Sequence, residues 1–478
     1  ISGLTLQNGL QDFGGAVTNA GGLLLQDVRL TGNSSDNGGA ATNSGRLIAY
    51  NSVFDGNAAA RDDADTGFGG AIWNNENSSV FISNTAVRTN AADQNGGGVF
   101  GFGHVQVADS TFTQNQAAAT GGAIDASGTL DVSRGVFGEN SANDGGAVAV
   151  RGGSAEITES AFTANRSDGL DLGGGGALFV FDAAATIVGG TFEDNIALGE
   201  GGGAIEANGT LTLRDSELVG NRAETHDESE FTAASDSGLG GALLIIAGSS
   251  ADIDNAVFAQ NHAGKSGGGI FNDLNTEVTI DGSNIVNNTA EREFGGGIKN
   301  GGVLTLNGGE ISGNTAGIHA GGIENAEGTV TLTDVGVRAN SAKVGGGLFN
   351  LGNGTMDLFD TTVADNEATG LVSGEVAGAG GGINNGFGVV RIDGGEVVGN
   401  AAAWGGGIAN SQRLELSRVR IADNTVKNQQ FAEGELVADG DAIRNFGTIH
   451  AGDGVEIVGV VLSSGSSTGL PDNVVAEL

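Results

Sequence analysis

The feature that most constrains the fold is a repeat that runs through almost the whole of the 478-residue chain. A motif of two glycines, a small residue and an aliphatic residue recurs through the chain. Its sixteen copies lie on average about 28 residues apart, and the last is degenerate, reading Gly440-Asp441-Ala442-Ile443. A repeat of this length predicts a solenoid whose copies stack on one another, rather than a set of separate globular domains. The aliphatic residues are Val17, Ala41, Ile72, Val99, Ile124, Val148, Leu178, Ile205, Leu243, Ile270, Ile298, Ile323, Leu348, Ile383, Ile408 and Ile443.

A second motif, a large apolar residue three positions before an Asn, follows each of the first fifteen copies. The Asn always lies 16 to 18 residues after the aliphatic residue. Side-chain amides at one position of stacked coils can hydrogen-bond to each other, so these residues predict an Asn ladder. They are Asn33, Asn57, Asn90, Asn115, Asn140, Asn165, Asn195, Asn221, Asn261, Asn288, Asn314, Asn340, Asn366, Asn400 and Asn424.

An alternating triplet such as Leu211-Thr212-Leu213 lies between the two motifs and predicts a strand with one buried face. The last residue of the triplet precedes the apolar residue of the Asn motif by five, as from Val132 to Phe137. An odd spacing reverses the faces of a straight strand, so a turn is expected between them, at residues such as Asp215-Ser216. Each repeat therefore predicts three short strands and three turns, with no helix.

Strands that repeat in one direction at this spacing cannot form hairpins and must stack as coils. Because parallel crossovers are almost always right-handed, the predicted fold is all-β, a right-handed parallel β-helix of about sixteen three-strand coils. It covers residues 1–446, and residues 447–478 are expected to be a C-terminal coil remnant or cap. The composition of 90 Gly and one Pro agrees, because Gly permits tight corners and Pro would remove a donor from strands paired on both sides.

The charge of the chain restricts its partners. A formal net charge of −38 repels nucleic acid and anionic lipid, so no nucleic-acid partner is expected. Cys is absent, which excludes disulfides and thiolate sites. No run of 18 apolar residues occurs, so no transmembrane helix is predicted. The acidic excess predicts a secreted or cell-surface protein in a saline environment.

The two motifs together resemble the repeats of chlamydial polymorphic outer-membrane proteins, usually written GGA(I/L/V) and FxxN. Strict copies include Gly69–Ile72 and Gly121–Ile124 for the first motif, and Phe112–Asn115 and Phe137–Asn140 for the second. The C-terminal half drifts to GGG(I/L) and (I/V)xxN. The resemblance implies display at the cell surface and a role in adhesion or interaction.

Several large apolar residues directly follow the aliphatic position, where strand alternation points side chains outward. An exposed column of this kind would mark a partner site. The alternatives are that another segment folds over it, or that the face assignment is wrong. The residues are Trp73, Phe100, Phe179, Leu244, Phe271 and Phe349.

Five intervals between an Asn and the next glycine motif are longer than the rest. They predict loops at one corner of the coil, which form either a binding edge or tolerated insertions. They contain residues 58–68, 166–174, 222–239, 367–379 and 425–439.

Two of these loops are acidic, around Asp63 and Asp65 and at His226-Asp227-Glu228-Ser229-Glu230. Calcium takes six to eight oxygen ligands, and neither segment supplies a full set. No cofactor is therefore predicted, with calcium at Asp63 and Asp65 left open against a solvated acidic loop.

The predicted function is a non-catalytic adhesin or interaction scaffold whose partner is a surface protein or a glycan. One alternative is a stalk that self-associates at its coil ends, because Ile1–Leu6 looks like a strand in mid-coil with no polar cap. The other is a polysaccharide lyase or hydrolase. It is disfavoured because Asp125 and Glu206 lie three coils apart, about 14 Å, whereas paired catalytic carboxylates lie closer.

Overall fold

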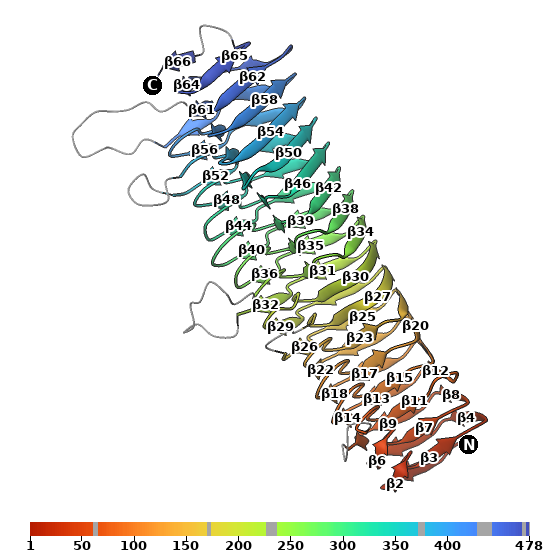
Figure 1. Cartoon of the computed structure of the whole chain (residues 1–478). Coiled ribbons are helices and arrows are strands. Elements are labelled where there is room, and N and C mark those ends of the chain that lie inside the picture. Colours follow the sequence, from red (N-terminus) through yellow and green to blue (C-terminus); the bar gives the residue numbers. More distant parts are fainter. Residues whose placement is uncertain are drawn as a thin grey trace. The chain divides into compact units, whose positions relative to one another are not determined.

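The computed structural model describes residues 1–60, 66–169, 174–225, 237–370, 378–427, 442–470 and 475–477. These residues form strands and turns, with no helix among them. The chain divides into two units, Ile1–Ala251 and Asp252–Leu478. Within each unit, strands from successive repeats lie side by side (Figure 1). The fold is a parallel β-helix of about fifteen turns, which confirms the all-β coil architecture predicted from the repeat.

Most coils carry their strands at the predicted places, with an additional strand of two to four residues after the Asn. In two coils the first two strands are continuous, as β27 (Leu178–Val188) and β30 (Ile205–Arg214). The first two strands of a coil belong to one sheet, and the third and fourth belong to two others. In the first unit one coil consists of β19 (Ile124–Ala126), β20 (Thr129–Ser133), β21 (Val136–Gly138) and β22 (Ser141–Ala142). In the second unit a corresponding coil consists of β45 (Ile323–Ala326), β46 (Thr329–Thr333), β47 (Gly336–Arg338) and β48 (Ser341–Ala342).

Other strands of the second unit carry the surfaces described below. The strands that follow the glycine motifs are β37 (Ile270–Asn272), β41 (Ile298–Asn300) and β49 (Leu348–Leu351). The triplet strands are β50 (Gly354–Phe359), β54 (Gly388–Asp393), β58 (Arg413–Ser417) and β62 (Thr448–Ala451). Beyond residue 447, β65 (Ser466–Thr468) still pairs in parallel with β62. The boundary between residues 446 and 447 stays a prediction.

The register between neighbouring coils pairs each residue with the residue at the equivalent position of the next coil, and the two are often of the same kind. Ile124 pairs with Val148, and Phe137 pairs with Phe162. The Phe rings of the Asn motif stack, with centroids 5.1 Å apart from Phe112 to Phe137 and 4.7 Å apart from Phe137 to Phe162. A continuous narrow core results, because each coil buries its apolar column against the columns of its two neighbours.

The turn expected between the triplet and the Asn motif is present. Asp109 and Asp215 adopt φ angles of 49° there, a left-handed conformation that Asp tolerates better than most residues. Ser216, the next residue, accepts a hydrogen bond on its Oγ from the backbone N–H of Gly190 in the preceding coil at 3.1 Å. This turn lets both apolar residues face the core despite the five-residue spacing.

The two glycine positions of the corner are required for different structural reasons. The first takes positive φ, as at Gly121 (+65°), yet Ala320 occupies the same position at 51°. The second makes a close approach, since a Cβ on Gly122 would lie 2.1 Å from the carbonyl oxygen of Gly146 in the next coil. The second glycine therefore sets how closely neighbouring coils approach at this corner.

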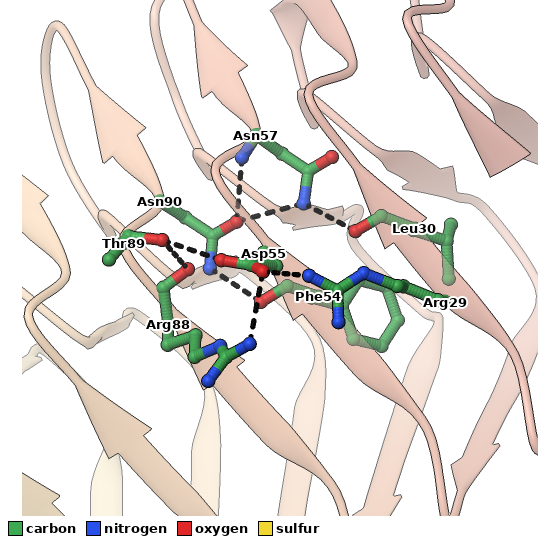
Figure 2. A network of polar contacts seen from close by, with 8 residues as sticks. All are labelled: Arg29, Leu30, Phe54, Asp55, Asn57, Arg88, Thr89 and Asn90. Atoms are coloured by element: carbon green, nitrogen blue, oxygen red, sulfur yellow. Dashed lines mark hydrogen bonds and ion pairs between the residues drawn. The ribbon is translucent and has the colours of Figure 1, made fainter. Parts of the chain in front are cut away.

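The predicted Asn ladder is confirmed and is drawn in Figure 2. The backbone N and Nδ2 of Asn57 both donate to Oδ1 of Asn90, at 2.9 Å. Each Nδ2 also donates to a backbone carbonyl, that of Leu30 for Asn57 and that of Phe54 for Asn90. The same pattern holds at the other predicted positions, Asn115, Asn140, Asn165, Asn195, Asn261, Asn314, Asn340 and Asn400.

Candidate binding surfaces

The column after the aliphatic position is not an exposed aromatic stripe. Phe100, Phe179, Leu244 and Phe349 are buried, with 1%, 7%, 2% and 6% of their surface exposed, so the expectation of exposure was wrong at these four positions. Trp73 and Phe271 are partly buried. The column lies outside the main core but is covered by another part of the coil.

Part of the cover comes from the residue directly before the glycine motif. This residue lies five positions ahead of the column residue in its own coil and stacks on the column residue of the next coil. The Phe68 ring lies 4.8 Å from the Phe100 ring, and the His319 ring lies 4.4 Å from the Phe349 ring. Within one coil, Thr42 donates its hydroxyl to the carbonyl of Asn37 at 2.9 Å. The sequence signal that could have revealed this second layer is the pairing of residues five apart across the glycine corner.

Two acidic residues of this column are buried in different ways. Asp125 accepts hydrogen bonds from Nη2 and Nε of Arg151 at 2.9 and 3.0 Å, and one from the hydroxyl of Thr120. Burial raises the pKa of Asp125, although the Arg151 charge and hydrogen bonds oppose the shift. Its carboxylate is therefore committed to an ion pair.

Glu206 is nine-tenths buried, and its Oε2 has no hydrogen-bond partner among the described residues. It lies in register between Phe179 and Leu244. Burial raises the pKa of Glu206 well above its ordinary value, and the negative charges of Asp144 and Glu200 raise it further. The folded chain therefore favours the neutral acid at this position.

We expect Glu206→Leu to stabilise the protein at pH 7 by about 1–3 kcal/mol, the cost of an unsatisfied buried polar atom. Because the folded-state pKa is raised, stability from the neutral acid is present below the ordinary pKa of 4.5 and is lost as pH rises above it. The stabilisation by Glu206→Leu should therefore be smaller below pH 4.5 than at pH 7. Urea unfolding at pH 7 and pH 4 measures it.

The matched control is Asp125→Leu in the same column, which should destabilise because Arg151 loses its partner. A lower stability of Glu206→Leu at pH 7 would contradict this account of Glu206.

The calcium hypothesis concerns residues that the structure does not describe. Asp63 and Asp65 lie outside the described residues, as does the acidic segment at residues 226–230. Among the described residues, no three His, Asp or Glu side chains come together as a set of metal ligands. Calcium at Asp63 and Asp65 stays a prediction.

Charged residues on the third strands tie coils together at the surface. Asp55 accepts a hydrogen bond from Arg88 at 3.1 Å and one from Thr89 at 2.8 Å, and it also pairs with Arg29 (Figure 2). Burial raises the pKa of Asp55, but the Thr89 and Arg88 hydrogen bonds outweigh it, so the pKa lies below its usual value. This carboxylate links three successive coils.

The outward face of the triplet strands carries a groove in the second unit. Asp357, Arg391, Glu415 and His450 occupy one column on β50, β54, β58 and β62. Together with Phe359 they line a hollow of about 410 Å³. We call this the Asp357–His450 groove.

Ion pairs fix the side chains of the Asp357–His450 groove. Arg391 contacts Asp357 at 2.9 Å and Glu415 at 3.1 Å. The hydrogen bond to Asp357 raises the pKa of Arg391, which is fully charged. Phe359 is 40% exposed beside them. The groove thus combines an oriented cation, two carboxylates and an exposed aromatic ring, the chemistry that binds polar ligands with an apolar face.

In the first unit, the outward face of the triplet strands also carries interacting side chains. Nε2 of His104 lies 2.8 Å from Oδ2 of Asp131 at its edge, and the Phe81 ring packs edge-on against the His104 ring. The guanidinium of Arg46 lies 4.8 Å from the centre of the Phe81 ring. This face was not predicted from the sequence. The available signal was the identity of the middle residue of each triplet.

A comparison with protein families matches residues 109–127 to the Chlamydia polymorphic membrane protein (Pmp) repeat. The matched segment contains the Phe112–Asn115 and Gly121–Ile124 motifs, and so one ladder Asn and one glycine corner. The chain is a Pmp-like β-helix repeat protein. The Pmp repeat characterises a family of surface proteins. Comparison of the Pmp-like chain with curated proteins and with solved structures gives no match.

The part of the Pmp-like chain that the structure describes contains no helix long and apolar enough to cross a membrane.

Proposed function

We propose that this Pmp-like chain is a non-catalytic adhesin or interaction scaffold displayed at the cell surface. The observation that carries the proposal is the Asp357–His450 groove, where paired charges and an exposed Phe359 are held on rigid parallel strands. The Pmp repeat supports display at the surface. Display in a saline environment stays a prediction from the net charge of −38.

The groove is suited to binding because its polar groups are already oriented. Arg391 is held between two carboxylates on neighbouring coils, so little side-chain entropy is lost when a partner arrives. Phe359 offers a flat apolar surface for a sugar ring or an apolar side chain. The partner class is therefore a glycan or a surface protein. Self-association through the coil ends stays a prediction.

Arg391→Ala tests the proposal. We expect it to weaken binding of the full chain to cultured epithelial cells about tenfold, because a few central residues, often Arg, Trp or Tyr, contribute most of the affinity of a contact. The ion pairs are partly exposed, so stability should change by less than about 1 kcal/mol. Flow cytometry with fluorescently labelled protein measures the binding.

The control is Arg420→Ala, which removes an exposed ion pair with Asp423 on another sheet of the same unit. Equal binding by the two variants would refute a role for the Asp357–His450 groove.

A further inference from the structure

A second groove in the Asp252–Leu478 unit lies beside the turns that follow β37, β41, β45 and β49, and it encloses about 290 Å³. Its apolar walls are Phe271, Leu274 and Leu351. Leu274 is 52% exposed at the rim. An aromatic ring beside an exposed aliphatic side chain forms a surface that gains free energy when it is covered. We call this the Lys299 groove.

Lys299 lies in this groove, on the rung next to Phe271. The residue is partly buried, and within the described residues its side chain forms no ion pair or hydrogen bond. A lysine ammonium without a counter-charge can pair with an anionic ligand group, and such charge-assisted hydrogen bonds are stronger than neutral ones. Lys343, in the same unit, is exposed to water instead.

Two carboxylates complete the lining. Asp273 and Glu327 lie in the same groove, yet neither pairs with Lys299. Carboxylate oxygens accept hydrogen bonds from hydroxyl groups. The groove thus presents one cation, two hydroxyl acceptors and an aromatic wall within a volume close to that of the smallest ligand sites, about 300 Å³.

We infer that the Lys299 groove binds one carboxylated pyranose of a glycan, a sialic acid or a uronic acid. The sugar carboxylate pairs with Nζ of Lys299, its hydroxyls donate to Asp273 and Glu327, and its apolar face covers Phe271. A neutral sugar would leave Lys299 uncompensated. The inference rests on the proposed function only in that the chain binds a partner, and this groove shares no residue with the Asp357–His450 groove.

The test measures binding of the full chain by isothermal titration calorimetry with two pairs of probes. The pairs are 3′-sialyllactose against lactose, and trigalacturonate against its methyl ester. We expect at least one acidic probe to bind with a Kd of about 1 mM, and its neutral counterpart to bind at least tenfold more weakly. The probe that binds identifies which acidic sugar is recognised.

Variants assign the binding to Lys299. Lys299→Met should weaken binding of the acidic probe at least tenfold, while Lys299→Arg keeps it. Lys343→Met removes an exposed lysine of the same unit and should leave the affinity unchanged.

The inference is overturned if acidic and neutral probes bind equally, or if Lys299→Met behaves like Lys343→Met. Tighter binding of a short peptide with a free C-terminal leucine would also overturn it, in favour of a protein ligand. If both acidic sugars fail to bind while binding to cultured cells remains sensitive to Arg391→Ala, this inference is wrong and the proposed function stands.

Discussion

Asn340→Ala is expected to lower the free energy of unfolding of the surrounding coils by about 3–4 kcal/mol. Asn340 is fully buried and takes part in five hydrogen bonds, through its backbone N and its side chain. Ala removes the side-chain acceptor for Asn314 and the side-chain donor to Ile311 and Asn366. Oδ1 of Asn366 keeps the backbone N–H at position 340, and Nδ2 of Asn314 keeps the carbonyl of Ile285. The backbone N–H of Asn314 loses its side-chain acceptor at a buried position, where water cannot replace it.

Native-state hydrogen exchange of the full chain measures this loss locally. Stability in a solenoid depends on neighbouring coils, so a single global unfolding energy is a poor readout. The control is Asn284→Ala, an exposed Asn on a strand of the same unit, with an expected change below about 0.5 kcal/mol. Equal protection in the two variants would show that the ladder does not stabilise the coils.

Phe137→Ala is expected to lower the local unfolding free energy by about 3–5 kcal/mol. Phe137 is fully buried and stacks between Phe112 and Phe162. Removing its ring leaves a cavity that rungs on both sides cannot close, because their spacing is fixed by strand hydrogen bonds.

Phe137→Leu should cost only about 1 kcal/mol, since Leu218 fills the same column in another coil. Phe181→Ala, at a Phe that is 46% exposed in the same unit, should cost less than about 1 kcal/mol. Hydrogen exchange again provides the measurement. A loss at Phe181 as large as that at Phe137 would contradict a core built from the stacked Phe column.

The fold was predictable from sequence because its contacts repeat with the chain. Asn140 and Phe137 bond and stack with the equivalent residues of neighbouring coils, so a regular spacing along the sequence becomes a column in space. The Asp and Ser turn after the triplet was predictable for the same reason.

The candidate sites were less predictable, because they depend on contacts that the repeat does not encode. Strand alternation places Phe100 outside the main core, but Phe68 on the preceding corner segment covers it. Arg391 contacts Asp357 and Glu415 across coils separated by loops of different length. Such pairs follow from register between coils, which the sequence of one repeat does not contain.

The proposed function requires a β-helix face that binds a partner without transforming it. Incubation of the full chain with cell-surface polysaccharide, followed by determination of retained glycan and newly released reducing ends in the same sample, tests this. We expect saturable retention that falls about tenfold in Arg391→Ala, with no reducing ends above the level of buffer alone. Sustained release of reducing ends would contradict it.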